Sequence, residues 1–207
     1  MKDLLVATTN LDKLREIRSA FATAATADKP LASLSIKLLT LADFPPVPVP
    51  EETADTFWEN ARVKAQAYAR ATGQLTVAED SGLCIDALAG EPGVKSARFL
   101  GADTSYPDRF AEIWKRMAAL PSPPRSARFV TALTLASPSE ILFETETSVE
   151  GAIHDRAAGA NGFGYDPIFF YAPFARTTAE LVDDEKAAIS HRARAFRNLR
   201  RFLAATA

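Results

Sequence analysis

The stretch LLVATTNLDKLREI, residues 4–17, decides how this chain begins to fold. Leu4 to Thr8 is a short apolar run that includes β-branched residues, which is typical of a buried strand. Asn10 follows it and is a preferred N-cap residue, because its side chain can accept hydrogen bonds from the free backbone N–H groups of a first helical turn. Apolar residues then recur with helical spacing up to residue 21. The stretch therefore predicts a strand that leads directly into an amphipathic helix.

Similar signals predict the elements that follow. Thr56 to Glu59 has the spacing of a capping box, and Gly73 is a natural end for the helix that begins there. Two short apolar runs, Leu75 to Ala78 and Leu83 to Leu88, predict two strands. The apolar spacing from Tyr106 to Leu120 predicts another helix.

The second half of the chain has a different pattern. Residues 129–135 and 143–149 alternate in polarity on either side of a turn at Ser137 to Ser139, which predicts an antiparallel hairpin with one wet face. A glycine-rich loop spans Gly159 to Gly164, and a last helix is predicted from Ser190 to Ala204. Helices that alternate with strands early, followed by a late hairpin, predict a mixed-sheet α/β fold.

The composition is that of an ordinary globular chain. Of the 207 residues, 47% are hydrophobic and 24% charged, which excludes a disordered chain, a collagen and a coiled coil. Cys84 is the single cysteine, so a disulfide framework and a four-cysteine zinc site are excluded. The formal net charge of −2 argues against a dedicated DNA coat. Because neither a signal-peptide pattern nor an 18-residue apolar run is visible, we expect a cytoplasmic protein without a membrane partner, built as one domain over residues 1–207.

A first candidate site lies where the predicted strand meets the first helix, at residues 8–13. A helix N-terminus attracts phosphate, because its N–H groups are unpaired and its dipole is positive there. Lys13 adds a positive charge, and Thr8 and Asn10 add side chains that form hydrogen bonds. An ordinary capped helix explains the same residues.

A second candidate site is Glu79-Asp80-Ser81-Gly82, which the pattern places at a strand end. A carboxylate there can hold Mg²⁺, which prefers one or two carboxylates together with substrate phosphates. Glu51-Glu52 precedes the Thr56 helix and can supply a further carboxylate. A solvated turn is the alternative for residues 79–82, and compensation of the helix dipole is the alternative for Glu51-Glu52.

Two further segments can recognise a base. Gly162 to Asp166 joins glycines, which permit a close approach of the backbone, to two aromatic side chains that can stack on a planar ring. A glycine-rich turn whose aromatic residues join the core is the alternative. Ser190-His191-Arg192 begins the last helix, where an anion or a base edge can be bound.

Taken together, these segments resemble the inosine triphosphate pyrophosphatase family. Six of its motifs occur in the family's order across residues 7–192. The matching segments are Ala7 to Lys13, Glu51-Glu52-Thr53 with Glu59-Asn60-Ala61 and Lys64, Glu79 to Leu83, Gly93 to Arg98, Gly162 to Pro167, and Glu185-Lys186 with Ser190-His191-Arg192.

The resemblance implies a fold and an activity. The expected fold is an elongated mixed β-sheet with helices forming two lobes around a central substrate cleft, in a protein that is typically a homodimer. The expected activity is Mg²⁺-dependent hydrolysis of noncanonical purine nucleoside triphosphates, namely dITP, ITP and XTP. Cleavage between the α and β phosphates gives the nucleoside monophosphate and pyrophosphate.

The resemblance also implies roles for particular residues. Asp80 would accept the proton and bind the metal together with Glu52, with Glu51 and Glu79 as helpers. The remaining matches imply substrate binding by Thr8, Thr9, Asn10, Leu11, Asp12, Lys13 and Lys64 at the triphosphate, by Ser81, by Phe163, Gly164, Tyr165 and Asp166 at the base, and by Lys186, His191 and Arg192 at the base edge.

The chain departs from the family pattern at three positions. Thr9 and Asp12 stand where many members have glycine, and Glu79 replaces a frequent aspartate. Two other functions remain as alternatives, a pyrophosphatase for modified pyrimidine triphosphates and a nonenzymatic nucleic-acid binder that uses its arginine-rich C-terminal helix. The near-neutral charge counts against the second, so we expect no stable nucleic-acid partner.

Overall fold

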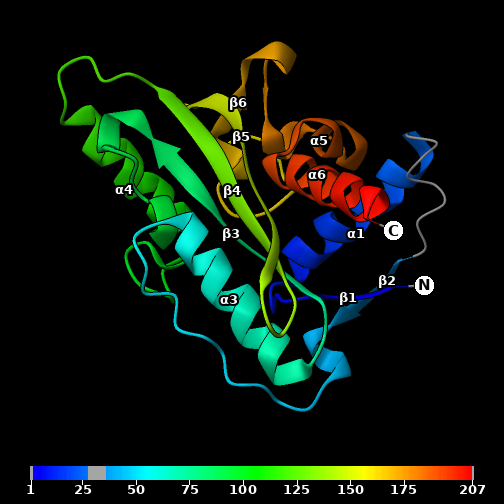
Figure 1. Ribbon diagram of the computed structural model, residues 1–207. Helices are drawn as coiled ribbons and strands as arrows, with labels where there is room; N and C mark the ends of the chain where they lie inside the picture. The colour runs from blue at the N-terminus through cyan, green and yellow to red at the C-terminus, as the bar shows by residue number, and fades with distance from the viewer. Residues whose placement is uncertain (1, 28–35, 207) are drawn as a thin grey trace. The chain divides into compact units, whose positions relative to one another are not determined.

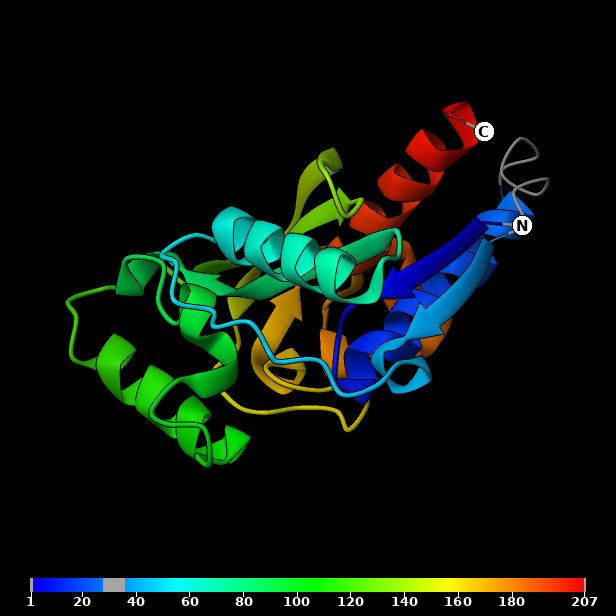
Figure 2. The same ribbon diagram turned by 60° about the horizontal axis from the view of Figure 1, so that its bottom comes forward.

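The computed structural model describes residues 2–27 and 36–206. Within them lies a seven-stranded sheet with the order β2-β1-β3-β4-β5-β6-β7, flanked by helices (Figure 1 and Figure 2). Its strands are β1 (Lys2–Val6), β2 (Ile36–Thr40), β3 (Thr76–Ile85), β4 (Ser126–Ala136), β5 (Ile141–Ile153), β6 (Phe169–Tyr171) and β7 (Arg176–Thr177). β1 pairs with β2 and β3 in parallel, whereas β6 pairs with β5 and β7 in antiparallel fashion. The predicted mixed-sheet α/β fold is therefore confirmed.

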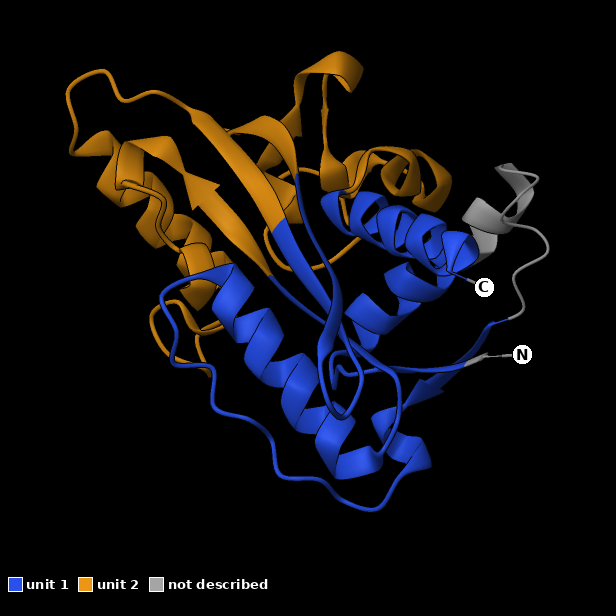
Figure 3. Ribbon diagram, viewed as in Figure 1, with its two compact units in different colours: residues 1–80, 131–147, 191–207 blue, residues 81–130, 148–190 orange. Residues whose placement is uncertain are grey.

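The chain divides into two units, which Figure 3 colours separately. Unit 1 takes its residues from 1–80, 131–147 and 191–207, and unit 2 takes its residues from 81–130 and 148–190. The boundaries fall inside β3, β4 and β5, so each of these strands contributes residues to both units.

Unit 1 packs helices on both faces of its strands. Its helices are α1 (Leu11–Ala27), the short η1 (Leu41–Asp43), α3 (Phe57–Thr72) and α6 (His191–Ala205). Leu4 and Val6 of β1 lie in one apolar cluster with residues of α1 and α6, and Leu5 lies in another with residues of α3. Because successive side chains of a strand point to opposite faces, α3 covers the face opposite to α1 and α6.

Unit 2 is built around α4 (Tyr106–Ala118) and several short turns of helix. These are η2 (Asp86–Leu88), η3 (Gly93–Arg98), η4 (Asp166–Ile168), η5 (Ala172–Phe174), η6 (Thr178–Glu180) and α5 (Asp183–Ile189). Phe110, Ile113 and Met117 of α4 pack with Phe169 of β6, which confirms the apolar face expected from their spacing.

The predicted helix ends are also confirmed. Asn10 accepts hydrogen bonds through Oδ1 from the backbone nitrogens of Asp12 (2.9 Å) and Lys13 (3.1 Å). Thr56 caps α3 by accepting a bond from the backbone nitrogen of Glu59, and Gly73 ends it in the left-handed conformation, with φ at 70°. These ends depend on residues a few positions apart, and so they are readable from the sequence.

Three predictions about strands need correction. Residues 75–78 and 83–88 do not form two strands, since β3 runs unbroken through Glu79-Asp80-Ser81-Gly82. The acidic pair therefore lies inside a strand and not at its end. A strand tolerates buried carboxylates where cations and hydrogen-bond donors partner them, as described below.

The expected wet face of the hairpin is absent from β4. β4 is buried from Phe129 onwards, because Leu133 and Leu135 pack on one side of it and Ala136 on the other. Within residues 129–135 and 143–149, the exposed position lies on β5, at Glu146. β2 and α5 were not predicted. Among the described residues, no helix is long and apolar enough to cross a membrane.

Candidate functional site

The side chain of Asn10 caps the first turn of α1. Asn10 uses its side-chain oxygen for the cap, and its own backbone nitrogen donates to Thr8 Oγ1 at 3.2 Å. Leu11 is 80% exposed, so its side chain is not part of the core. Asp12 Oδ1 lies 3.1 Å from Arg15 Nη2, so a cation on the same helix compensates part of the negative charge of Asp12. The expected cap of this helix by Asn10 is thus confirmed.

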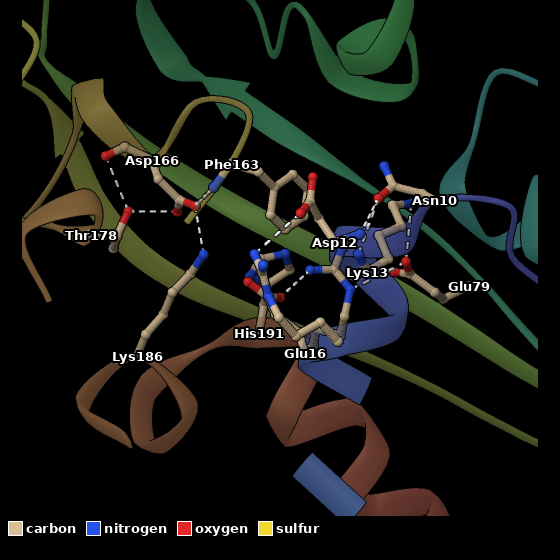
Figure 4. Close-up of polar contacts among 12 residues, drawn as sticks. Asn10, Asp12, Lys13, Glu16, Glu79, Phe163, Asp166, Thr178, Lys186 and His191 are labelled. Atoms are coloured by element: carbon tan, nitrogen blue, oxygen red, sulfur yellow. Dashed lines mark hydrogen bonds and ion pairs between the residues drawn. The ribbon is translucent and has the colours of Figure 1, made fainter. Parts of the chain in front are cut away.

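Glu79 lies at the centre of a buried ionic network in unit 1. Its Oε1 is 3.0 Å from Lys13 Nζ and accepts a bond from Arg192 Nε at 3.2 Å. Arg192, which is 3% exposed, also donates through Nη1 to Glu16 Oε2 at 2.5 Å. Figure 4 shows Lys13, Glu79 and Glu16 around this network. Burial raises the pKa of the Glu79 carboxyl, but Arg192 and Lys13 outweigh burial and hold that pKa well below its usual range.

Asp80, the next residue, has different partners. Its Oδ2 accepts a hydrogen bond from Asn60 Nδ2 at 3.0 Å, and its Oδ1 lies 3.5 Å from Lys64 Nζ. Lys64 also lies 3.1 Å from Glu52 Oε2, so one lysine joins the two predicted metal-binding carboxylates. Burial raises the pKa of the Asp80 carboxyl, Lys64 and Lys13 oppose that rise, and Glu52 adds to it; the net shift of the pKa is upward.

Asn60 is a site residue to which the sequence assigned no role. Its Oδ1 accepts from the backbone nitrogen of Ala54 at 3.1 Å, and its Nδ2 donates to the backbone oxygen of Ala54 at 3.3 Å as well as to Asp80. One amide therefore joins the segment that carries Glu52 to Asp80. The motif Glu59-Asn60-Ala61 was the available signal, but spacing alone does not show which side chain faces Asp80.

The donor set of unit 1 fits a magnesium ion that is shared with phosphate. Among residues 2–27 and 36–206, no group of three or more His, Cys, Asp or Glu side chains could hold a metal ion by itself. Mg²⁺ commonly takes one or two carboxylates and completes its shell with water and phosphate oxygens, which Glu52 and Asp80 can match. Glu79 Oε2 is buried without a hydrogen-bond partner among the described residues, so it is a further oxygen with unused accepting capacity.

In unit 2, the loop from Gly162 to Asp166 is closely tied together (Figure 4). Asp166 accepts bonds through Oδ2 from the backbone nitrogen of Phe163 (2.8 Å) and from Lys186 Nζ (2.5 Å), and through Oδ1 from Thr178 Oγ1 (2.8 Å). Gly162 has φ at 72°, and a Cβ atom there would lie 2.2 Å from Asp166 Oδ2. Glycine is therefore required for the loop to close on its own aspartate.

The two aromatic residues of this loop have different surroundings. Phe163 is partly exposed, and Lys186 Nζ lies 5.2 Å from the centre of its ring. Tyr165 is buried and belongs to the apolar cluster of unit 2. The alternative of a turn whose aromatic residues join the core is thus correct for Tyr165, whereas Phe163 keeps a surface on which a planar ring can stack.

The predicted site residues form two sets, one in each unit. Unit 1 holds Thr8 to Lys13, Glu52, Lys64, Asp80 and Arg192, with exposed Glu51 beside Glu52. His191 is buried there, and its backbone oxygen accepts a bond from Thr147 Oγ1 at 2.7 Å. Unit 2 holds Ser81, the loop residues Phe163 to Asp166, and Lys186.

The chain is similar to proteins of known family over almost its whole length. A protein of Listeria monocytogenes named dITP/XTP pyrophosphatase is 40% identical over 204 residues, which cover 99% of this chain and 96% of that protein. A protein of the same name from Exiguobacterium sibiricum is 41% identical and covers 95% of this chain and 94% of its own length. A solved HAM1 protein from Coxiella burnetii superposes with a TM-score of 0.85 at 37% identity, covering 98% of both chains. The model of the Ham1 family matches residues 4–202, and the chain therefore belongs to the Ham1 family.

Proposed function

We propose that this protein hydrolyses noncanonical purine nucleoside triphosphates, dITP, ITP and XTP, to the nucleoside monophosphate and pyrophosphate. The observation that carries the proposal is the pair Glu79 and Asp80, buried side by side with pKa values shifted in opposite directions and with lysines beside both. Two neighbouring carboxylates whose environments separate their pKa values are typical of acid–base chemistry. The relatives named dITP/XTP pyrophosphatase support the same substrates.

The triphosphate binds to unit 1. The N-terminus of α1 offers a positive dipole, and Lys13 and Lys64 add charges that neutralise phosphate oxygens. Lys13 is paired with Glu79, and Lys64 is paired with Glu52 and Asp80, so both ammonium groups are held in place before substrate arrives. Such preorganisation stabilises charge that develops as the phosphate bond breaks.

Asp80 accepts the proton of the attacking water. Water adds at phosphorus, the bond between the α and β phosphates breaks, and pyrophosphate leaves with the electron pair of that bond. Asn60 and Lys64 hold the Asp80 carboxylate in place, so that it can accept this proton in one orientation. Glu52 and Asp80 would hold Mg²⁺, which neutralises phosphate charge when it is bound.

The base is recognised by residues of the loop and of the last two helices. The ring of Phe163 stacks on the base with Gly164 beside it, and the buried residues Tyr165 and Asp166 hold the loop in place. Lys186, His191 and Arg192 supply hydrogen-bond donors, which suit the 6-keto oxygen of hypoxanthine and xanthine. Arg192 also binds Glu79 and Glu16, so the same guanidinium joins base recognition to the ionic network of unit 1.

The whole chain would act as one pyrophosphatase domain, in the cytoplasm, as a homodimer without a nucleic-acid partner. A pyrophosphatase for modified pyrimidine triphosphates is the competing activity, and substrate choice separates it from the proposed one.

Pyrophosphate release should be measured for dITP, ITP, XTP, ATP, GTP and a modified pyrimidine triphosphate, each with and without Mg²⁺. We expect the three noncanonical purines to give the highest kcat/KM, and activity to depend on Mg²⁺. A preference for the pyrimidine, or equal rates on all purines, would overturn the proposed specificity. Binding to nucleic acid that falls steeply with salt, without any hydrolysis, would favour the nonenzymatic alternative.

A further inference from the structure

The motif Gly93 to Arg98 has no part in the proposed chemistry, yet it is closely bonded within unit 2. Its Ser96 is buried, and the hydroxyl accepts a hydrogen bond from the backbone nitrogen of Leu83 at 2.9 Å while it donates to the backbone oxygen of Gly93 at 2.6 Å. Leu83 lies in β3, three residues after Asp80. Ser96 thus attaches η3 to the strand that carries the acidic pair.

Arg109 of α4 donates hydrogen bonds to the backbone oxygens of the segment that contains this serine. Its side chain is 2% exposed, and Nη1 donates to the oxygens of Ser96 (3.1 Å) and Ala97 (3.0 Å). Nη2 donates to the oxygens of Gly101 (3.1 Å) and Ala102 (3.4 Å). Few side chains other than arginine can supply several donors in one rigid plane, so this guanidinium holds residues 96–102 in one conformation.

The same carbonyl of Ser96 also binds the base loop. Tyr165 donates its hydroxyl to Ser96 O at 2.9 Å, and its ring packs edge-on against Tyr106 at 5.3 Å. Tyr106 in turn lies under the Arg109 guanidinium, 4.8 Å from it. Burial raises the pKa of Tyr165, so the phenol stays protonated and remains a donor.

The loop is therefore held at two consecutive residues. Asp166 is bonded to Thr178 and Lys186, and Tyr165 is bonded to Ser96, whose carbonyl Arg109 also binds. Phe163, with its partly exposed ring, is two residues from Tyr165. Asp166 fixes the backbone nitrogen of Phe163. Tyr106 packs against Tyr165 and lies next to Gly164, so the position of Tyr165 also determines the backbone conformation at Gly164.

We propose that Arg109 is a positioning residue for base recognition, which acts through Ser96 and Tyr165 on the loop that presents Phe163. The inference rests on the proposed function for the identity of the substrate, but the structural step, in which Arg109 holds the loop of residues 162–166, does not. Loss of Arg109 frees the carbonyls of residues 96–102, Tyr165 loses its fixed acceptor, and Phe163 no longer meets the base in one orientation. The phosphate-binding residues of unit 1 have no part in this chain of contacts.

The test compares Arg109→Met, Arg109→Lys and Tyr165→Phe with the wild-type protein. KM for ITP is measured beside the inhibition constant of tripolyphosphate, a ligand without a base. We expect Arg109→Met to raise KM for ITP by about 10-fold or more, and Tyr165→Phe by about 2- to 10-fold, the scale of one lost hydrogen bond. The inhibition constant of tripolyphosphate should stay within about 2-fold, since it reports on unit 1. Arg109→Lys keeps the charge but not the planar fork, and should fall between wild type and Arg109→Met.

Two controls separate positioning from general damage. Arg128→Met changes another arginine of unit 2, which pairs with Asp86 at the surface, and it should leave KM for ITP unchanged. The double variant Arg109→Met/Tyr165→Phe should raise KM by less than the product of the single effects, because both residues act through Ser96 O.

Several results would overturn the inference. These are an unchanged KM for ITP, an equal rise in KM and in the tripolyphosphate constant, or independent effects in the double variant. If Arg109→Met does not fold, Arg109→Lys and Tyr165→Phe carry the same test. If the wild-type protein does not hydrolyse ITP, the proposed function fails, and hydrogen exchange of residues 162–166 still decides the structural step: faster exchange in Arg109→Lys supports it, and unchanged exchange rejects it.

Discussion

Glu79 and Asp80 are adjacent in β3, but Glu79 is held by Arg192 and Lys13 whereas Asp80 is held by Asn60 and Lys64. Successive side chains of a strand point to opposite faces, which is why neighbours meet such different partners. Burial raises the pKa of both carboxyls, and the nearby cations outweigh burial at Glu79 but not at Asp80. Cations therefore compensate the buried charge of Glu79 more fully than that of Asp80.

Asp80→Asn should lower kcat by at least about 100-fold, the usual contribution of a general base. The substitution keeps the shape of the side chain and removes its charge. Turnover is measured on ITP at saturating Mg²⁺, with thermal unfolding as the check of folding. Asp86→Asn is a matched control, since Asp86 bonds to Ser126 and Arg128 at the surface of unit 2. Near-normal turnover by a folded Asp80→Asn protein would reject the assignment.

Lys13→Ala should weaken the use of ITP and of GTP by the same factor. Lys13 is assigned to the phosphates, which both nucleotides share, so the identity of the base should not matter. The ratio of kcat/KM on the two substrates is the readout, and Lys115→Ala, at an exposed lysine of α4, is the control. A tenfold change in that ratio would mean that Lys13 reads the base.

Arg192→Ala should lower the free energy of unfolding by about 3–5 kcal/mol. The variant leaves the buried carboxylate of Glu79, and also Glu16, without their cation, and an uncompensated buried charge is costly. Replacing Glu79 by glutamine in the same chain should restore part of the loss. Urea unfolding of the single and double variants measures both effects, and a loss of less than about 1 kcal/mol in the single variant would contradict the importance of the network.

The same Arg192→Ala variant should also narrow the preference for ITP and XTP over ATP. A donor lost from the base edge removes a mismatch with the 6-amino group of adenine, and such a mismatch is worth about 1–3 kcal/mol, roughly 10- to 150-fold. Values of kcat/KM on the four triphosphates ITP, XTP, ATP and GTP decide the point, measured at a temperature where the variant is folded. An unchanged ratio of ITP to ATP would remove Arg192 from base recognition and leave it a structural role beside Glu79.

Asn60→Ala should lower kcat by about 10-fold or more. Its amide orients Asp80 and holds Ala54, so without it the carboxylate is free to rotate away from the attacking water. Asn198→Ala is a suitable control, because Asn198 also donates from a partly buried amide, to Thr145 Oγ1. A full rate in Asn60→Ala would show that Lys64 alone is enough to orient Asp80.

Local signals were sufficient for the ends of the helices and for the class of the fold. The caps at Asn10 and Thr56 and the end at Gly73 use atoms two to four residues away, so that the sequence pattern contains both partners. The apolar face of α4 was readable for the same reason, since spacing along one helix decides which side chains share a face.

The course of β3 was not readable in this way. Two acids, a serine and a glycine interrupt the apolar pattern, and the expectation of two strands followed from that interruption. The strand continues because Lys13, Lys64 and Arg192 compensate the charge of the buried carboxylates. These cations come from α1, α3 and α6, which are distant from β3 in the sequence or separated from it by a turn.

Which residues would carry the chemistry could be named from motifs, but how they are held could not. Arg192 and Glu79 are 113 positions apart and meet only after β3 and α6 have folded together. Asn60 and Arg109 bind backbone atoms of Ala54 and of residues 96–102. Every residue type has these backbone atoms, so the sequence does not show which residues take part in such contacts. Motifs record side-chain identity, whereas orientation and pKa depend on burial and on charges brought near by folding, and these properties exist only in the folded chain.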